Sequence, residues 1–110
     1  MCLRSVIREK PREILAVDAQ STDKTTEVLK ENALRILVDP YRSLGYSRQL
    51  GLAAATSRYV MFVDSDVELG DNCVALLLSD LENYDWVGVH AKLLSPGIAD
   101  SKTPMFTWFF

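Results

Sequence analysis

Short apolar runs of about strand length alternate along the chain with longer segments in which apolar residues recur at helical spacing. The apolar runs predict strands over residues 13–18, 35–39, 59–63 and 86–91. The intervening segments predict helices over residues 1–10, 23–33 and 46–55, and a fourth helix that Asp71 caps. Because strands and helices alternate with short connections, the pattern predicts βαβ units and a mainly parallel sheet flanked by helices, an α/β fold.

The periodicity also indicates which side of each helix is buried. Leu3, Val6 and Ile7 fall on one face of the first helix. The fourth helix has a longer apolar stripe, formed by Val74, Leu77, Leu78 and Leu81. The helix over residues 23–33 is mostly polar, so we expect it on the surface. Ser21 and Thr22 offer its N-cap, and Asp23 favours the positive end of its dipole.

Each of the first three predicted strands ends in aspartate, at Asp18, Asp39 and Asp64. The carboxyl ends of parallel strands meet at one edge of a sheet, where α/β proteins bind ligands. The third strand continues into Asp64-Ser65-Asp66, whose alternating carboxylates suit a hard divalent cation that shares a phosphate. These residues predict a metal-bridged nucleotide site, although aspartate is also a common turn and cap residue after a strand.

Composition and charge narrow the classes of partner. The net charge is −3 and the twelve basic residues are scattered, which gives no electrostatic case for binding nucleic acid. Cys2 and Cys73 form neither a metal-ligand spacing nor a disulfide framework, so we expect both to be reduced, as in a cytosolic protein. No apolar stretch approaches the ~18 residues that span a bilayer. We therefore expect the cytoplasm or the cytoplasmic face of a membrane, since a membrane-associated parent protein is compatible with the apolar run over residues 105–110.

Three segments together resemble the family 2 glycosyltransferases, which are nucleotide-sugar enzymes of the GT-A fold. Residues 13–25, EILAVDAQSTDKT, resemble that family's strand-to-helix segment, and residues 45–51, GYSRQLG, are similar to its Ala-Arg-Asn-x-Gly helix start. Residues 59–66, YVMFVDSD, resemble its D-x-D strand end. The resemblance covers roughly residues 1–94. It implies a partial GT-A (Rossmann-like) domain that lacks its first strand, with residues 95–110 unassigned at the start of the acceptor-side segment.

The resemblance implies a role for each matching residue. Asp18 would accept the imino N–H of uracil or guanine, and Arg48, in the first turn of its helix, would bind the diphosphate. Asp66 would be the principal ligand of Mn²⁺ or Mg²⁺, and Asp64 would contact the ribose or the metal with its water shell. Gln49 stands where the family has asparagine. The general base would lie beyond residue 110.

The resemblance therefore implies sugar transfer from a nucleoside-diphosphate sugar to an acceptor hydroxyl on a glycan, lipid or protein, with inversion. We expect the chain alone to bind a nucleotide weakly or not at all, and to be inactive. One alternative is a phosphohydrolase of the haloacid-dehalogenase type, with Asp64 as nucleophile and Asp66 as acid/base, because residues 62–67 match its first motif. Another is a non-catalytic nucleotide-binding scaffold.

Overall fold

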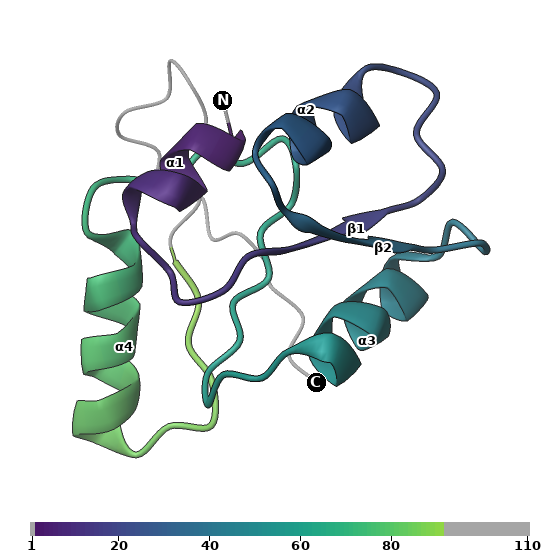
Figure 1. The fold of residues 1–110 in the computed structure, drawn as a ribbon. Coiled ribbons are helices and arrows are strands. Elements are labelled where there is room, and N and C mark those ends of the chain that lie inside the picture. The colour runs from purple at the N-terminus through teal and green to yellow at the C-terminus, as the bar shows by residue number, and fades with distance from the viewer. Residues whose placement is uncertain (1, 92–110) are drawn as a thin grey trace, which may run out of the picture. The chain divides into compact units, whose positions relative to one another are not determined.

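The computed structural model describes residues 2–91, and the chain divides into two compact units between Leu69 and Gly70. The first unit contains, in chain order, α1 (Cys2–Arg8), β1 (Leu15–Asp18), α2 (Thr25–Glu31), β2 (Arg35–Val38) and α3 (Leu44–Ala54) (Figure 1). The second contains α4 (Cys73–Tyr84). The helices and the first two strands were all predicted, and the α/β class is confirmed.

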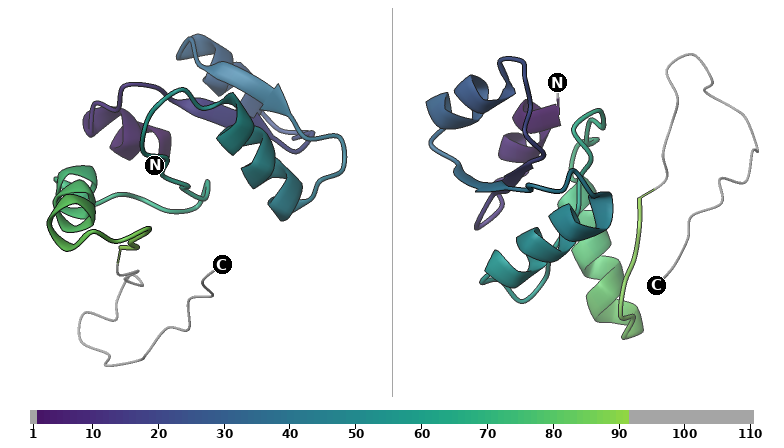
Figure 2. Two further views of the ribbon diagram at one scale, coloured as in Figure 1. Left: turned by 90° about the horizontal axis from the view of Figure 1, so that it is seen from below. Right: turned by 90° about the vertical axis from the view of Figure 1, so that its right-hand side faces the viewer.

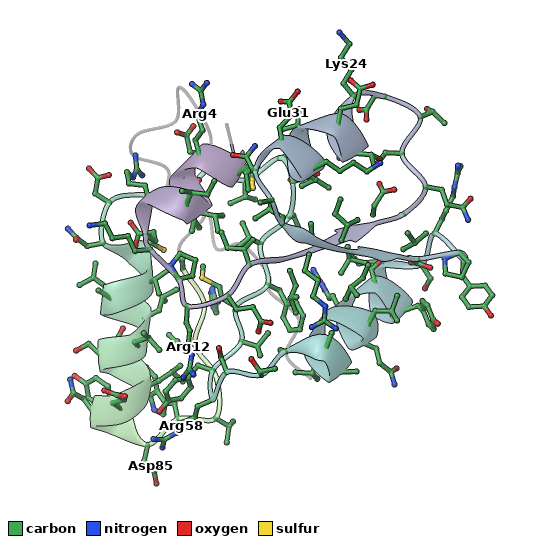
Figure 3. All side chains as sticks on the ribbon, viewed as in Figure 1. Arg4, Arg12, Lys24, Glu31, Arg58 and Asp85 are labelled. Atoms are coloured by element: carbon green, nitrogen blue, oxygen red, sulfur yellow. The ribbon has the colours of Figure 1, made fainter. Side chains whose placement is uncertain are left out.

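The sheet consists of β1 and β2, which pair in parallel from Leu15 opposite Arg35 to Asp18 opposite Val38. One further hydrogen bond continues the ladder, because the backbone N–H of Asp39 donates to the carbonyl of Asp18 at 2.8 Å. The sheet lies between α2 and α3 (Figures 1 and 2). Lys24 and Glu31 point away from the sheet (Figure 3), so α2 is a surface helix as its polar sequence predicts.

The helix α3 packs closely on β1. A methyl group placed on Gly51 would lie 3.6 Å from Cγ2 of Val17, which is ordinary van der Waals contact. The far end of the helix is fastened by Glu13, whose Oε2 accepts hydrogen bonds from the backbone N–H and the hydroxyl of Thr56 at 3.1 and 3.2 Å. The helix that carries Arg48 is therefore fixed to the sheet at its middle and at its end.

The predicted third strand, residues 59–63, is wrong: the segment has no strand structure. A strand requires a hydrogen-bonded neighbour. Here residues 59–64 and β1 line one cavity of about 220 Å³ rather than forming a ladder. The apolar side chains of the segment consequently stay partly in solvent, with Phe62 49% exposed. Among the described residues, Leu69 is the single buried apolar residue, with 6% of its surface exposed.

The helix α1 holds the segment that follows Asp66. The Ser5 hydroxyl, which is buried, accepts a hydrogen bond from the N–H of Leu69 at 3.0 Å and donates to the carbonyl of Cys2 at 2.7 Å. The Arg8 guanidinium donates to the Leu69 carbonyl at 2.7 Å. In line with the predicted apolar face of this helix, Leu3 and Val6 are half-buried, whereas Ile7 is exposed.

The second unit departs from the sequence prediction at both ends of its helix. The N-cap of α4 is Asn72, with a left-handed φ of 60°, so Asp71 was wrongly predicted as the cap. The predicted stripe is half-buried at Val74, Leu77, Leu78 and Leu81. The predicted fourth strand, residues 86–91, does not form, and the ring of Trp86 instead stacks on Tyr84 with centroids 4.8 Å apart. Residues 95–110 lie outside the described part of the chain.

Across residues 2–91, no helix has the length and apolar character needed to cross a bilayer.

Candidate functional site

The cavity of the first unit lies among β1, α3 and residues 57–64. Its wall is apolar along Leu15 and Val17 of β1 and along residues 60–63. Three charged side chains also line it: Arg48 from α3, Asp64 at the end of residues 59–64, and Glu13, which precedes β1. An apolar wall with a few charged groups is typical of a small-molecule site.

The sequence predicted that Arg48 and Asp64 serve the same site, and the structure brings them together. Arg48 Nη2 lies 3.5 Å from Asp64 Oδ1, and their side chains are 47% and 57% exposed. At this distance and exposure the pair is weak, since water screens both charges. Both groups are therefore accessible to a charged ligand.

Asp64 and Asp66 lie on a tight turn, which the N–H of Val67 closes by donating to the Asp64 carbonyl at 3.0 Å. Both carboxylates are exposed. Within residues 2–91, no group of three or more histidine, cysteine, aspartate or glutamate side chains could hold a metal ion. Two carboxylates nevertheless fit Mg²⁺ or Mn²⁺ at a phosphate site, because such ions keep several waters and take other oxygens from the phosphates.

Asp18 lies at the end of β1 and does not line this cavity. Its side chain is 8% exposed, and the backbone N–H of Ser21 donates to both of its carboxylate oxygens, at 3.1 and 3.3 Å. Asp18 thus shapes the turn that follows β1. An ionised carboxylate has about four acceptor positions, so these two bonds leave capacity for a further donor.

Asp23 also serves as a local structural group. Its Oδ1 accepts the N–H of Thr25 at 2.9 Å at the start of α2. Hydrogen bonds from the Thr25 side chain and backbone lower the pKa of the Asp23 carboxyl. Asp23 therefore caps α2 from the position before the N-cap residue, which is Lys24 and not Ser21 or Thr22 as the sequence predicted.

Asp39 was predicted only as a strand end, yet it is the most buried carboxylate in residues 2–91, with no exposed surface. It accepts hydrogen bonds from the N–H of Tyr41 at 2.7 Å, the N–H of Ser43 at 2.9 Å and the hydroxyl of Ser47 at 2.7 Å. Burial raises the pKa of Asp39, but these bonds outweigh it, so the pKa lies below the ordinary value of 3.8. The recurring aspartate pattern was a signal for this residue, but its partners depend on how the loop folds.

Arg42 lies in the loop between β2 and α3. In the structure its Nη2 donates to the Gln20 carbonyl at 3.1 Å, and Gln20 Nε2 donates to the Pro40 carbonyl at 3.3 Å. These bonds join the loop after β1 to the loop after β2. Arg42 is thus a link between loops.

Cys2 lies beside the two acidic residues of the turn. Its Sγ donates to the Asp64 carbonyl at 3.4 Å. Burial raises the pKa of the Cys2 thiol, and the negative charges of Asp66 and Asp64 raise it further. The pKa of the Cys2 thiol therefore depends on the charge of Asp64 and Asp66. The spacing of these residues in the sequence did not indicate that they lie close together.

Comparison with known proteins gives one informative result. Neither a curated protein nor a solved structure matches the chain. A family model described as glycosyl transferase family 2 matches residues 1–105, almost the whole chain. This match agrees with the four helices and the parallel two-stranded sheet found in residues 2–91, as expected of a partial GT-A domain. The chain belongs to glycosyl transferase family 2.

Proposed function

We propose that the chain binds the nucleoside-diphosphate part of a sugar donor, in a glycosyltransferase that transfers the sugar to an acceptor hydroxyl with inversion. The acceptor hydroxyl belongs to a glycan, a lipid or a protein. The observation that carries the proposal is the meeting of Arg48 and Asp64 at one cavity, 3.5 Å apart, with Asp66 on the same turn as Asp64. A cationic fork beside two carboxylates suits a diphosphate that is shared with a divalent cation.

Each side chain has a defined task in this proposal. Arg48 binds diphosphate oxygens through its guanidinium, and Asp18 accepts the imino N–H of the base. Asp64 and Asp66 hold Mn²⁺ or Mg²⁺, with Asp64 also within reach of the ribose. The bound ion neutralises the charge that develops on the leaving diphosphate.

A titration of the ¹⁵N-labelled chain followed by NMR tests the proposal and detects weak binding. With Mg²⁺ present, UDP or GDP is expected to shift the amides of residues 45–51 and 64–67, whereas CDP and ADP, whose bases lack an imino N–H, bind less well. Mn²⁺ is expected to broaden resonances around Asp66 through its unpaired electrons.

The matched variants are Asp66→Ala and Glu31→Ala, since both remove an exposed carboxylate but Glu31 points away from the sheet on α2 (Figure 3). Asp66→Ala is expected to abolish the Mn²⁺ broadening, and Glu31→Ala to leave it unchanged. Equal responses of the two variants, or no nucleotide-induced shift in the wild-type chain, would refute the proposal.

The family match gives the phosphohydrolase alternative no support. The two reactions also differ in a direct assay, because a phosphohydrolase would use Asp64 as a nucleophile and bind beryllium fluoride as an aspartyl-phosphate mimic. We expect no tight Mg²⁺-dependent binding of beryllium fluoride. A non-catalytic scaffold would bind nucleotide without the dependence on Asp66.

A further inference from the structure

Asp39 lies between the end of β1, which carries Asp18, and the start of α3, which carries Arg48. Its backbone N–H donates to the carbonyl of Asp18 at 2.8 Å, so the end of β2 is tied to the end of β1. Its side chain is completely buried, although it is a carboxylate. A buried charge is retained only where enough donors compensate for the lost water, which is the case here.

Two of the three donors to the Asp39 carboxylate come from the start of α3, and the third is the N–H of Tyr41 in the preceding loop. Ser43, the N-cap residue of α3, has no side-chain capping bond of its own, and its N–H bonds to Asp39 Oδ2 at 2.9 Å. The Ser47 hydroxyl bonds to the same oxygen at 2.7 Å. Because Ser47 directly precedes Arg48 in the first turns of α3, these bonds fix the position from which the Arg48 side chain extends.

A second connection joins the same loops. Arg42 and Gln20 both have left-handed backbones, with φ of 51° and 60°, which are unfavourable for residues other than glycine. The hydrogen bonds from Arg42 to the Gln20 carbonyl and from Gln20 to the Pro40 carbonyl lie at these positions. The unfavourable conformations therefore occur where the two loops are linked, next to Asp18 on one side and Asp39 on the other.

We infer that Asp39 is a positioning residue, which holds the Asp18 loop and the Arg48 helix in the relative placement that a single nucleoside diphosphate requires. Asp39 acts through its neighbours and does not touch the ligand. The inference rests on the proposed function for its ligand, but the linkage itself is a property of the ligand-free chain. It predicts that a change at Asp39 disturbs two loops that are far apart in sequence.

The first test uses ¹⁵N spectra of the full chain without ligand. Asp39→Asn replaces a buried acceptor by an amide, and Ser47→Ala removes one donor to it, whereas Ser47→Thr keeps the hydroxyl. We expect Asp39→Asn and Ser47→Ala to move the amide of Ser21 and the guanidinium N–H of Arg48, and Ser47→Thr to restore both. The matched control is Asp23→Asn. It also changes a carboxylate to an amide, but the Asp23 carboxylate bonds to the N–H of Thr25 and takes no part in the hydrogen bonds that link the two loops.

The second test measures the affinity for UDP and GDP in Mg²⁺, at a temperature where all variants are folded. Asp39→Asn and Ser47→Ala are expected to lower the affinity about fivefold or more, Ser47→Thr to recover it, and Asp23→Asn to leave it unchanged. If Asp39→Asn does not fold, the ligand-free spectra of the pair at Ser47 decide the question, because Ser47 itself lines the cavity and its affinity change alone could come from direct contact with the ligand.

The outcomes separate the two claims. If the wild-type chain binds no nucleoside diphosphate, the proposed function fails, and the ligand-free spectra alone judge the linkage. If Ser47→Ala or Asp39→Asn changes only residues 39–47 and leaves the Ser21 amide in place, the positioning role is overturned. A loss of thermal stability with unchanged affinity in a binding-competent chain would also overturn it, since Asp39 would then be purely structural.

Discussion

Replacing Arg48 by methionine removes a charge but keeps most of the side chain's length, and the structure predicts a small effect on folding. At the 3.5 Å separation from Asp64, the Coulomb energy in water is about 1.2 kcal/mol. Because both side chains are about half exposed, a net contribution of about 0.2–1 kcal/mol is expected after screening and side-chain entropy. The midpoint of thermal unfolding should therefore fall by no more than about 4–8 °C.

The effect on nucleotide affinity should be larger. A hydrogen bond to a charged group contributes about 1.5–3 kcal/mol, which corresponds to about 10–150-fold in affinity. Without metal, the nucleotide must first displace the Arg48–Asp64 pair, so up to about 1 kcal/mol of that gain is lost. With Mg²⁺ on Asp64 the pair is already broken. Arg48→Met should thus weaken nucleotide binding more in the presence of Mg²⁺ than in its absence.

Isothermal calorimetry or NMR titration with UDP and GDP, with and without Mg²⁺, measures this difference. The matched control is Arg35→Met, since the Arg35 guanidinium is also exposed and donates to the Ala54 carbonyl at 3.4 Å, at the other end of α3. An affinity for nucleotide in Mg²⁺ that Arg48→Met changes by less than about twofold would refute the reasoning. So would an equal loss in Arg35→Met, which would point to general charge attraction.

Three further predictions concern the turn and the buried carboxylate. In a chain with Cys73→Ser, Mg²⁺ should accelerate alkylation of Cys2. Burial and then the charges of Asp66 and Asp64 raise the pKa of this thiol, and a cation on the two carboxylates would offset their charge and so increase the reactive thiolate fraction. An unchanged rate would argue against metal binding at this turn. Nucleoside diphosphate and Mn²⁺ should each raise the affinity for the other, and thermal-shift titrations should show that Asp66→Ala removes this synergy; persistence of the synergy would place the metal elsewhere. Asp39 should stabilise the fold above its ordinary pKa of 3.8 and lose that contribution as the pH falls through its lower folded pKa. The stability advantage of wild type over Asp39→Asn should therefore shrink below pH 3.8, which acid unfolding followed by circular dichroism measures. An advantage independent of pH would contradict the direction of the pKa shift.

Local patterns in the sequence predicted the helices and the first two strands because the information for them is local. Helical spacing of apolar residues and nearby caps are read within a few positions. The segments over residues 59–63 and 86–91 have the same strand-like composition as β1 and β2, but pairing with a neighbour decides whether a strand forms. The cap of α4 differs by one residue for a related reason, because the left-handed backbone of Asn72 sets where the helix begins.

The candidate site was predicted in part. The proximity of Arg48 and Asp64 followed from the family-like segments that carry them, and their roles stay predictions. The importance of Asp39 was not visible, since its donors, at Tyr41, Ser43 and Ser47, become neighbours only when the loop closes onto α3. Residue type alone does not distinguish a buried aspartate such as Asp39 from an exposed one such as Asp66.

The partly exposed segment over residues 59–62 has a consequence for the handling of the protein. Tyr-Val-Met-Phe is uncharged, free of proline and rich in residues that favour strands, which are the properties of sequences that associate into intermolecular sheets. Charges flank it, with Arg58 placed over the Tyr59 ring at 5.1 Å and Asp64 two residues past Phe62. These flanking charges act as gatekeepers, so self-association should increase with salt, which screens them, and with any substitution that neutralises Arg58.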